Sequence, residues 1–263
     1  MDLGIRGKTA IVCASSKGLG KGCAQALAEA GVNLVLNARG AEALEATAHE
    51  IRSAHQVQVA TVAGDITSDE GQAAVLAAAR EMGGGVDILV NNAGGPPPGL
   101  WSDWEREDWL KALNSNMLTP IALIKAVLPG MIERKWGRIV NITSQSVKSP
   151  IPVLGLSNAA RAGLTGYVAG TSRQVAQHGV VMNNLLPGAH DTDRIKSLNA
   201  AEVEKRGITM DEAMAERANA VPTRRIGTPA EFGATCAFMC SQHVGFMIGQ
   251  NVLLDGGIGN TTM

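Results

Sequence analysis

The stretch Thr9–Gly20 has the sequence Thr-Ala-Ile-Val-Cys-Ala-Ser-Ser-Lys-Gly-Leu-Gly. Its mostly apolar first part, Thr9–Cys13, predicts a short buried strand, and an alanine-rich helical pattern continues beyond the stretch as far as Ala30. The loop between them, Ala14–Gly20, contains glycines that allow a sharp turn and a close approach of the backbone to a ligand. A glycine loop in this position is typical of a dinucleotide site, because the N–H groups and the dipole at the start of the helix attract a pyrophosphate.

Strands and helices alternate along the rest of the chain. Further strands are predicted at Val32–Leu36, Val57–Ala63, Val86–Val90, Arg138–Ile142, Val180–Leu185 and Asn251–Leu254. Helices are predicted at Ala41–Ser53, Ser68–Met82, Trp109–Lys135 (with an internal Pro120), Ser157–Gln177 and Pro229–Cys240, with a polar helical stretch over Asp191–Asn219. Apolar strands alternating with amphipathic helices favour an α/β fold with a parallel sheet buried on both faces. Right-handed crossovers make this a doubly wound Rossmann fold, and the absence of a linker predicts one domain over residues 1–263.

Composition excludes several classes of protein. The 263 residues are 45% hydrophobic with a net charge of −1, which argues against disorder and against nucleic acid as a partner. No stretch approaches the roughly 20 apolar residues of a membrane span, and the N-terminus lacks a signal peptide, so we expect a cytoplasmic protein without a membrane partner. The four cysteines lack CxxC spacing, so we expect them to be reduced thiols in the core. The five histidines lack the spacing of metal ligands, so we expect no metal site.

The residues that follow the second predicted strand indicate which dinucleotide binds. A carboxylate at this position would bind the ribose hydroxyls of NAD, but the sequence there is Asn37-Ala38-Arg39. Arg39 could pair with a ribose 2′-phosphate through its planar guanidinium, and Lys17 could add a second positive charge. The sequence therefore favours NADP(H) over NAD, unless Arg39 is only a solvated surface charge.

From about Gly7 to Gly257 the order of motifs resembles that of the short-chain dehydrogenase/reductase family, in its 3-oxoacyl-[acyl-carrier-protein] reductase-like branch. The matching features are the glycine loop (with Cys13-Ala14 in place of the family's Thr-Gly), Asp65, Asn91-Asn92-Ala93-Gly94, Asn116, Ser144, and Pro187-Gly188 followed by Thr192. The resemblance implies Asn116 and Ser144 as catalytic residues. It implies a cofactor site formed by Ser15, Ser16, Lys17, Gly18, Leu19, Gly20, Arg39, Asp65, Ile66, Asn92, Ala93, Gly94, Arg161, Pro187, Gly188 and Thr192.

The chain departs from the family at the motif YxxxK. This motif should begin thirteen residues after Ser144, where the sequence is Ser157-Asn158-Ala159-Ala160-Arg161. In the family, the tyrosine transfers the proton while the lysine lowers its pKa and binds the nicotinamide ribose. A serine hydroxyl is far less acidic than a phenol, so Ser157 is a poor sole proton donor. Arg161 cannot relay protons, but it can still bind the ribose and supply positive charge.

Three other residues are weaker candidates for proton transfer. Tyr167 lies ten residues after Ser157, almost three turns further along the same helix, where packing is the simpler role. His190 lies two residues after Gly188 and titrates near neutral pH, although a solvent-facing loop histidine is the alternative. Lys148 follows Ser144 by four residues, in a loop that lines the substrate pocket in the family, and an ordinary surface lysine is the alternative.

Two further segments concern the pocket and the surface. The loop Gly95-Pro96-Pro97-Pro98-Gly99-Leu100-Trp101 could form a rigid wall of the pocket, and Trp101, Trp104 and Trp109 could line a substrate cleft or pack in the core. Residues 190–221 resemble the variable substrate lid of the family. The helices at 109–135 and 157–177 resemble those that pair four subunits, so a homotetramer is expected, with a dimer as the alternative.

Three functions remain open from the sequence. The first is an NADPH-dependent oxidoreductase that reduces a carbonyl, a 3-oxoacyl group or another ketone or aldehyde, with Ser144, Ser157, Arg161 and Asn116 in a non-standard active site. The second is a sensor or regulatory protein that binds NADP(H) without turnover. The third is a non-redox lyase or hydrolase that uses the same pocket, with His190 as the first residue to test. Each takes a small molecule as its substrate or ligand.

Overall fold

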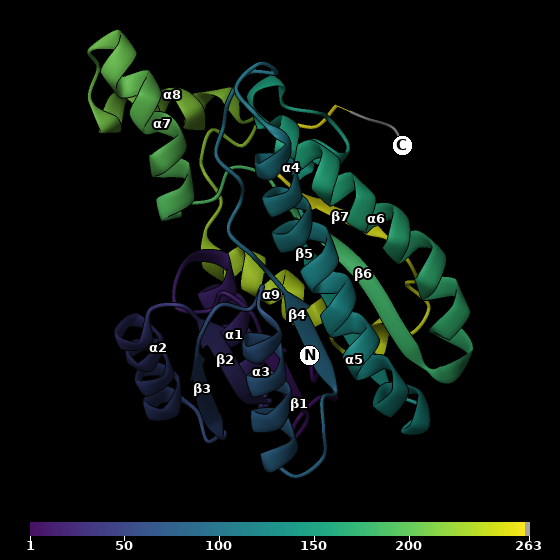
Figure 1. Cartoon of the computed structure of the whole chain (residues 1–263). Coiled ribbons are helices and arrows are strands. Elements are labelled where there is room, and N and C mark those ends of the chain that lie inside the picture. Colours follow the sequence, from purple (N-terminus) through teal and green to yellow (C-terminus); the bar gives the residue numbers. More distant parts are fainter. Residues whose placement is uncertain (261–263) are drawn as a thin grey trace.

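Seven parallel strands form a single sheet in the computed structural model, which describes residues 1–260 apart from the side chains at positions 201, 202 and 205 (Figure 1). The strands lie in the order β3-β2-β1-β4-β5-β6-β7. Their bounds are β1 Thr9–Val12, β2 Asn33–Ala38, β3 Val59–Ala63, β4 Ile88–Asn91, β5 Gly137–Ile142, β6 Val180–Pro187 and β7 Asn251–Leu254. The predicted single-domain Rossmann fold is confirmed. The chain order reverses between β1 and β4, and such a switch point leaves a crevice at the carboxyl ends of the strands.

Helices cover both faces of the sheet. On one face, α1 (Gly18–Glu29), α2 (Ala41–Ala54) and α9 (Pro229–Met239) bury their apolar sides in a core that contains Leu27, Leu44 and Phe232. On the other face, α3 (Asp69–Glu81), α5 (Thr119–Glu133) and α6 (Gly155–Val175) enclose a second core. Close helix contact depends on glycine, because a Cβ at Gly22 in α1 would lie 2.2 Å from the carbonyl oxygen of Pro229 in α9. All four cysteines are free and buried.

One long helical segment differs from its prediction. The expected helix over 109–135 is instead α4 (Arg106–Leu113), a π-helical turn (Asn114–Leu118) and α5 in succession. Pro120 is at the start of α5 rather than inside a regular helix, because its nitrogen cannot donate to the carbonyl of Asn116. Over Arg106–Glu133 the helix is long and apolar enough to cross a membrane by length and composition, contrary to the sequence expectation. α5 packs against β4 and β5, and its residues Leu123, Ile124, Val127 and Met131 are buried in the second core.

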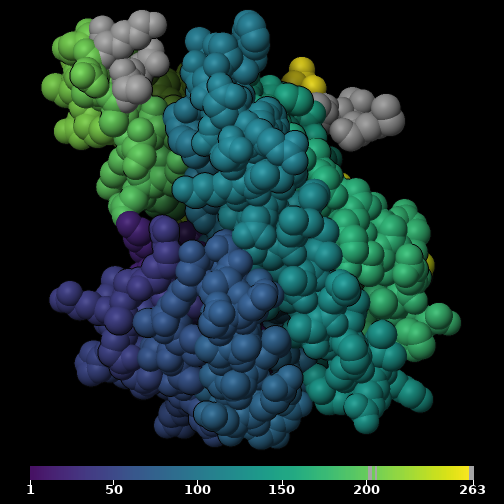
Figure 2. All heavy atoms as spheres, viewed as in Figure 1, coloured from purple at the N-terminus to yellow at the C-terminus, as the bar shows by residue number. Residues whose placement is uncertain are grey.

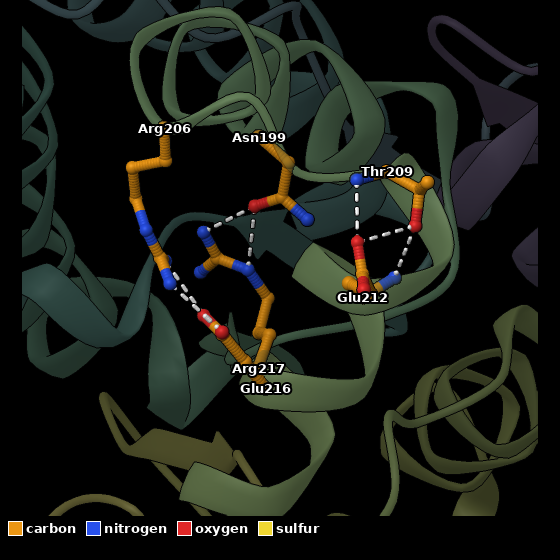
Figure 3. A network of polar contacts seen from close by, with 6 residues as sticks. All are labelled: Asn199, Arg206, Thr209, Glu212, Glu216 and Arg217. Atoms are coloured by element: carbon orange, nitrogen blue, oxygen red, sulfur yellow. Dashed lines mark hydrogen bonds and ion pairs between the residues drawn. The ribbon is translucent and has the colours of Figure 1, made fainter.

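Residues 190–221, here named the α7–α8 segment, project beyond the carboxyl ends of the strands (Figure 1). The predicted polar helical stretch is two helices, α7 (Asp193–Arg206) and α8 (Met210–Ala220), because Gly207 ends α7 in a left-handed conformation with φ of 66°. Polar contacts within the segment hold the two helices together (Figure 3). Arg206 donates to both oxygens of Glu216 at 2.7 and 2.8 Å, and Arg217 donates twice to Oδ1 of Asn199.

The glycine loop contains one strained residue. Ala14 has φ of 48°, in the left-handed region that costs an L-residue about 1–2 kcal/mol. We expect Ala14→Gly to raise the free energy of unfolding by about 0.5–1 kcal/mol, since the relief of strain exceeds the added entropy of the unfolded chain. Urea unfolding followed by circular dichroism measures the change. Ala30→Gly is the matched control, because Ala30 has φ of −76° and the same substitution there should destabilise the protein. If both variants were destabilised equally, Ala14 would not be strained.

Candidate active site

A cavity of about 610 Å³ lies at the carboxyl ends of the central strands, between the glycine loop and the α7–α8 segment. Its wall comes from parts of the chain that are distant in sequence, and these are the glycine loop, the ends of β4, β5 and β6, the first turn of α6 and both helices of the α7–α8 segment. In Figure 2 the α7–α8 segment stands out from the rest of the surface at the upper left. The cavity is large enough for a small-molecule site of ordinary size.

The glycine loop forms one side of the cavity with a close backbone approach. Lys17, Gly18 and Leu19 line the cavity, and a Cβ added at Gly20 would lie 2.2 Å from the carbonyl oxygen of Ala14. No acidic residue lies in the first turn of α1, so nothing in that turn opposes an anion at its N-terminus. This backbone geometry fits the pyrophosphate of a dinucleotide.

The two serines of the glycine loop support it rather than line the cavity. Ser15 is fully buried, and its hydroxyl oxygen accepts a hydrogen bond from the backbone N–H of Asn37 at 3.2 Å. The carbonyl of Ser16 accepts a hydrogen bond from the hydroxyl of Thr47 in α2 at 2.9 Å. These contacts fix the loop against β2 and α2. The Ser15 side chain therefore has a backbone partner within the protein, whereas Ser16 is held through its backbone carbonyl.

The predicted adenosine-binding residues lie along the neighbouring edge of the sheet, outside the cavity wall. Arg39 is exposed just after β2. The carboxylate of Asp65 accepts hydrogen bonds from the N–H and hydroxyl of Thr67 at 2.9 and 2.8 Å, and these bonds, with the nearby charge of Arg39, lower the pKa of Asp65. Ile66 packs in the core beneath. The exposed guanidinium of Arg39 is thus available at this edge for an anionic ligand.

Ser144 and Ser157 face the same cavity from two different elements. Ser144 follows β5, and its hydroxyl oxygen accepts the backbone N–H of Ser146 at 3.1 Å, so its proton remains available to a ligand. Ser157 is in the first turn of α6, with 6% of its surface exposed. Asn92, Ala93 and Gly94 line the cavity from the end of β4, and Pro187, Gly188 and Thr192 line it from the end of β6. The two hydroxyls therefore lie between the predicted cofactor-binding segments.

Arg161 lies one helical turn after Ser157, directly behind the cavity wall. Its Nη1 donates to the carbonyl of Ile142 at 2.6 Å and its Nη2 to the carbonyl of Ala93 at 3.4 Å. Burial and the charge of Arg194 lower the pKa of Arg161 to about 10, so its guanidinium stays charged at neutral pH. The arginine ties the end of β5 to the segment after β4 and places a positive charge beside the serines.

Several buried polar side-chain atoms have no partner among the described residues, and those of Thr143 and Gln145 belong to residues of the cavity wall. In the described part of the chain, the Oδ1 atom of Asn116, in the π-helical turn, is buried without a hydrogen-bond partner, and so are side-chain oxygens of Thr143, Gln145, Ser146 and Asn158. Buried polar atoms normally have partners, so these positions indicate water or ligand contacts. Gln145 lines the cavity and was missed from the sequence, although its position directly after Ser144 was a usable signal.

The other candidates for proton transfer occupy different environments. Tyr167 packs against the core that α3, α5 and α6 enclose. Among the described residues, Lys148 is not part of the cavity wall. His190 does line the cavity, but only 4% of it is exposed, its Nδ1 lies 3.3 Å from the carbonyl oxygen of Gly188 and its ring packs edge-on against Phe232. Burial lowers the pKa of His190, so the ring is neutral at neutral pH.

The tryptophans belong to the surroundings of the cavity rather than to its described wall. Trp104 packs between two glycines, since a Cβ would lie 3.0 Å from its indole nitrogen at Gly99 and 2.6 Å from its ring at Gly155. Trp109 contacts Trp104 edge-on with ring centres 5.9 Å apart, and Trp101 is 89% exposed. Trp104 and Trp109 therefore pack against their neighbours and do not line the cavity that the described residues form.

The sequence and the fold are similar to those of known reductases. A family model described as "Enoyl-(Acyl carrier protein) reductase" matches residues 13–259. The 3-oxoacyl-[acyl-carrier-protein] reductase FabG of Vibrio cholerae is 33% identical over 258 residues, covering 97% of this chain and 99% of that protein. The NADPH-dependent reductase BacG of Bacillus subtilis is 29% identical, covering 95% of this chain and 97% of that protein.

Solved structures agree with this relationship. The L-sorbose reductase of Gluconobacter frateurii, solved in complex with NADPH and L-sorbose, superimposes with a TM-score of 0.94 at 28% identity. That alignment covers 99% of this chain and 100% of the reductase. The family match, the 33% identity to a protein of nearly equal length and the shared fold lead to one conclusion. The chain belongs to the short-chain dehydrogenase/reductase family of oxidoreductases, in its 3-oxoacyl-[acyl-carrier-protein] reductase-like branch.

Proposed function

We propose that this chain is an NADPH-dependent reductase that converts a ketone or aldehyde, such as a 3-oxoacyl group, to an alcohol. The observation that carries the proposal is the position of Ser144 and Ser157, whose hydroxyls face one cavity beside the glycine loop and the Gly188–Thr192 segment. Family membership supports the reaction class. In this proposal residues 190–221 act as the lid of the substrate site within a single cofactor-binding domain.

The proposed cofactor is NADP(H), which supplies a hydride to the carbonyl carbon when bound. Its diphosphate would bind at the start of α1, its nicotinamide beside Gly188 and Thr192, and its 2′-phosphate at Arg39. The exposed guanidinium of Arg39 supports this choice over NAD. The name of the Bacillus subtilis relative and the NADPH in the L-sorbose reductase complex support it further.

The chain's own residues would then stabilise the reacting oxygen. In the proposed mechanism the hydroxyls of Ser144 and Ser157 donate hydrogen bonds to the carbonyl oxygen, which gains negative charge in the transition state. Arg161 binds the nicotinamide ribose and adds positive charge to the site. Ser157 relays the proton from a water chain that Asn116 supports, since the buried Oδ1 of Asn116 has no protein partner.

A second candidate function is binding of NADP(H) without turnover. The sequence feature that favours it is the pair Ser157 and Arg161, since the resemblance implies a tyrosine and a lysine at these positions. The only tyrosine of the chain, Tyr167, packs in the core and offers no replacement. A sensor would retain the glycine loop and Arg39 and lose only proton transfer.

We also propose a cytoplasmic homotetramer, assembled through the helices at 109–135 and 157–177. Leu110 and Leu118, with 51% and 49% of their surfaces exposed, supply apolar side chains on the first of these helical segments. Burial of such side chains between copies would be favourable.

Purified protein provides the first test of turnover. We expect the wild type to oxidise NADPH, followed by absorbance, with at least one member of a panel of 3-oxoacyl thioesters, diketones, quinones and aldehydes. Ser144→Ala should lower kcat by about 100-fold or more, because it removes a hydrogen bond to the developing oxyanion. Tight NADPH binding with no turnover on any compound would favour the sensor.

Arg39→Asp tests the choice of cofactor. We expect it to weaken NADPH binding by at least about tenfold and to leave NADH binding within about threefold, because it removes a charge-assisted contact that only the 2′-phosphate makes. Fluorescence titration with both nucleotides measures the two dissociation constants. Equal weakening of both would be inconsistent with a phosphate contact at Arg39.

The double variant Ser157→Tyr with Arg161→Lys restores the family's motif. We expect kcat for carbonyl reduction to rise, since a phenol beside an ammonium is a better acid than an alcohol. NADPH binding serves as the control, because it should change little. An intact cofactor affinity without any gain in kcat would mean that the cavity geometry has also diverged.

A further inference from the structure

The charged residues of the cavity wall differ in whether they have a partner of opposite charge. Both wall carboxylates have lysine partners, since Asp193 lies 2.6 Å from the Nζ of Lys17 and Asp191 lies 3.8 Å from that of Lys196. Arg194 also lines the cavity, but the contact of its guanidinium is with a neutral backbone carbonyl. Within the described part of the chain, no carboxylate lies within ion-pair distance of Arg194. The wall therefore carries a half-buried positive charge that no carboxylate among the described residues neutralises.

Arg194 crosses from the first turn of α7 to the proline loop that follows β4. Its Nη2 donates to the carbonyl of Pro96 at 2.6 Å. Gly95 permits this approach, because a Cβ there would lie 3.2 Å from the same nitrogen. A guanidinium has five N–H donors, so four remain for another partner. Unlike the buried Arg161, which bonds to two carbonyls, Arg194 lines the cavity with one carbonyl partner, so an anionic ligand would satisfy donors that the fold leaves free.

The surroundings of Arg194 identify the substrate side of the cavity. The proline loop that it contacts is bonded to the segment before α6, through the N–H of Gly99 and the carbonyl of Val153 at 2.9 Å. That segment contributes the apolar wall residues Ile151 and Leu154. The proposed diphosphate site at the start of α1 is in another part of the cavity wall, where backbone N–H groups would bind the diphosphate. Arg194 is also near enough to Arg161, beside the serines, for their charges to repel.

We propose that Arg194 binds an anionic group of the carbonyl substrate, which makes the preferred substrates keto acids with an apolar chain rather than neutral ketones. This inference rests on the proposed reductase function. Arginine suits the task because its planar fork pairs with both oxygens of a carboxylate. The apolar residues Ile151 and Leu154 would contact the carbon chain, and Ser144 and Ser157 the carbonyl.

The test compares acids with their esters in the enzyme–NADPH complex. Calorimetry measures the binding of 2-oxo, 3-oxo, 4-oxo and 5-oxo acids and of the methyl ester of each, and NADPH oxidation is followed in parallel. For the wild type we expect at least one acid to bind about tenfold more tightly than its ester, the effect of one charge-assisted contact. Arg194→Met should abolish this preference, and Arg194→Lys should retain part of it.

Arg206→Met is the matched control. It removes a guanidinium from the same helix and breaks the pairing with Glu216, but Arg206 is at the far end of α7. The preference for the acid should survive in this variant, which separates loss of charge at the cavity from a general loosening of the α7–α8 segment. Its loss in both variants would overturn the assignment to Arg194.

Four other outcomes are decisive. Equal binding of every acid and its ester by the wild type, or no binding of any acid, overturns the inference. Weaker NADPH binding in Arg194→Met with an unchanged ratio of acid to ester assigns the arginine to the cofactor diphosphate instead. Arg194-dependent acid binding without NADPH oxidation sustains the inference and rejects the reductase function, so the two failures are distinguishable.

Discussion

The active site depends on β1 and β4 lying side by side although about 75 residues separate them in the chain. Their parallel pairing brings the glycine loop next to the Asn92–Gly95 segment, and the amide of Asn92 donates to the carbonyl of Ala14 at 3.4 Å across the junction. Strand order reverses at this point, so no crossover helix covers the carboxyl ends. The cavity follows from the topology before any side chain is considered.

Arg161 adds a second constraint, because its guanidinium is buried behind the cavity wall. A guanidinium directs its donors within one plane, and here they bond to the carbonyls at the ends of β5 and beyond β4. The guanidinium thereby joins the end of β5 to the segment that follows β4. Arg161 thus stabilises the fold and supplies a positive charge near Ser157, and neither role requires it to transfer a proton.

The sequence predicted the fold well because apolar strands of four to eight residues and glycine-marked turns are local signals. It singled out Ser144, Ser157 and the segments at 92–94 and 187–192 only through family resemblance, and the structure brings these residues to one cavity. It missed the π-helical turn at Asn116, since i→i+5 bonding depends on the neighbouring Pro120 and on packing. It also missed Arg194, because a charge in a polar helix looks solvated until the partner loop at Pro96 is known. Trp104 was ambiguous for the same reason, as its glycine neighbours at positions 99 and 155 are distant in sequence from each other.

The internal bonding of the α7–α8 segment has an evolutionary consequence. Its two helices are held mainly by contacts between themselves, with Arg206 on Glu216 and Arg217 on Asn199 (Figure 3), and Gly207 provides the turn. Substitutions of cavity-facing residues in this segment, or the insertion or deletion of a helical turn, should therefore have little effect on the sheet. The cavity wall that α7 and α8 contribute can therefore vary in evolution while the glycine loop and the ends of β4 and β5 keep their sequence.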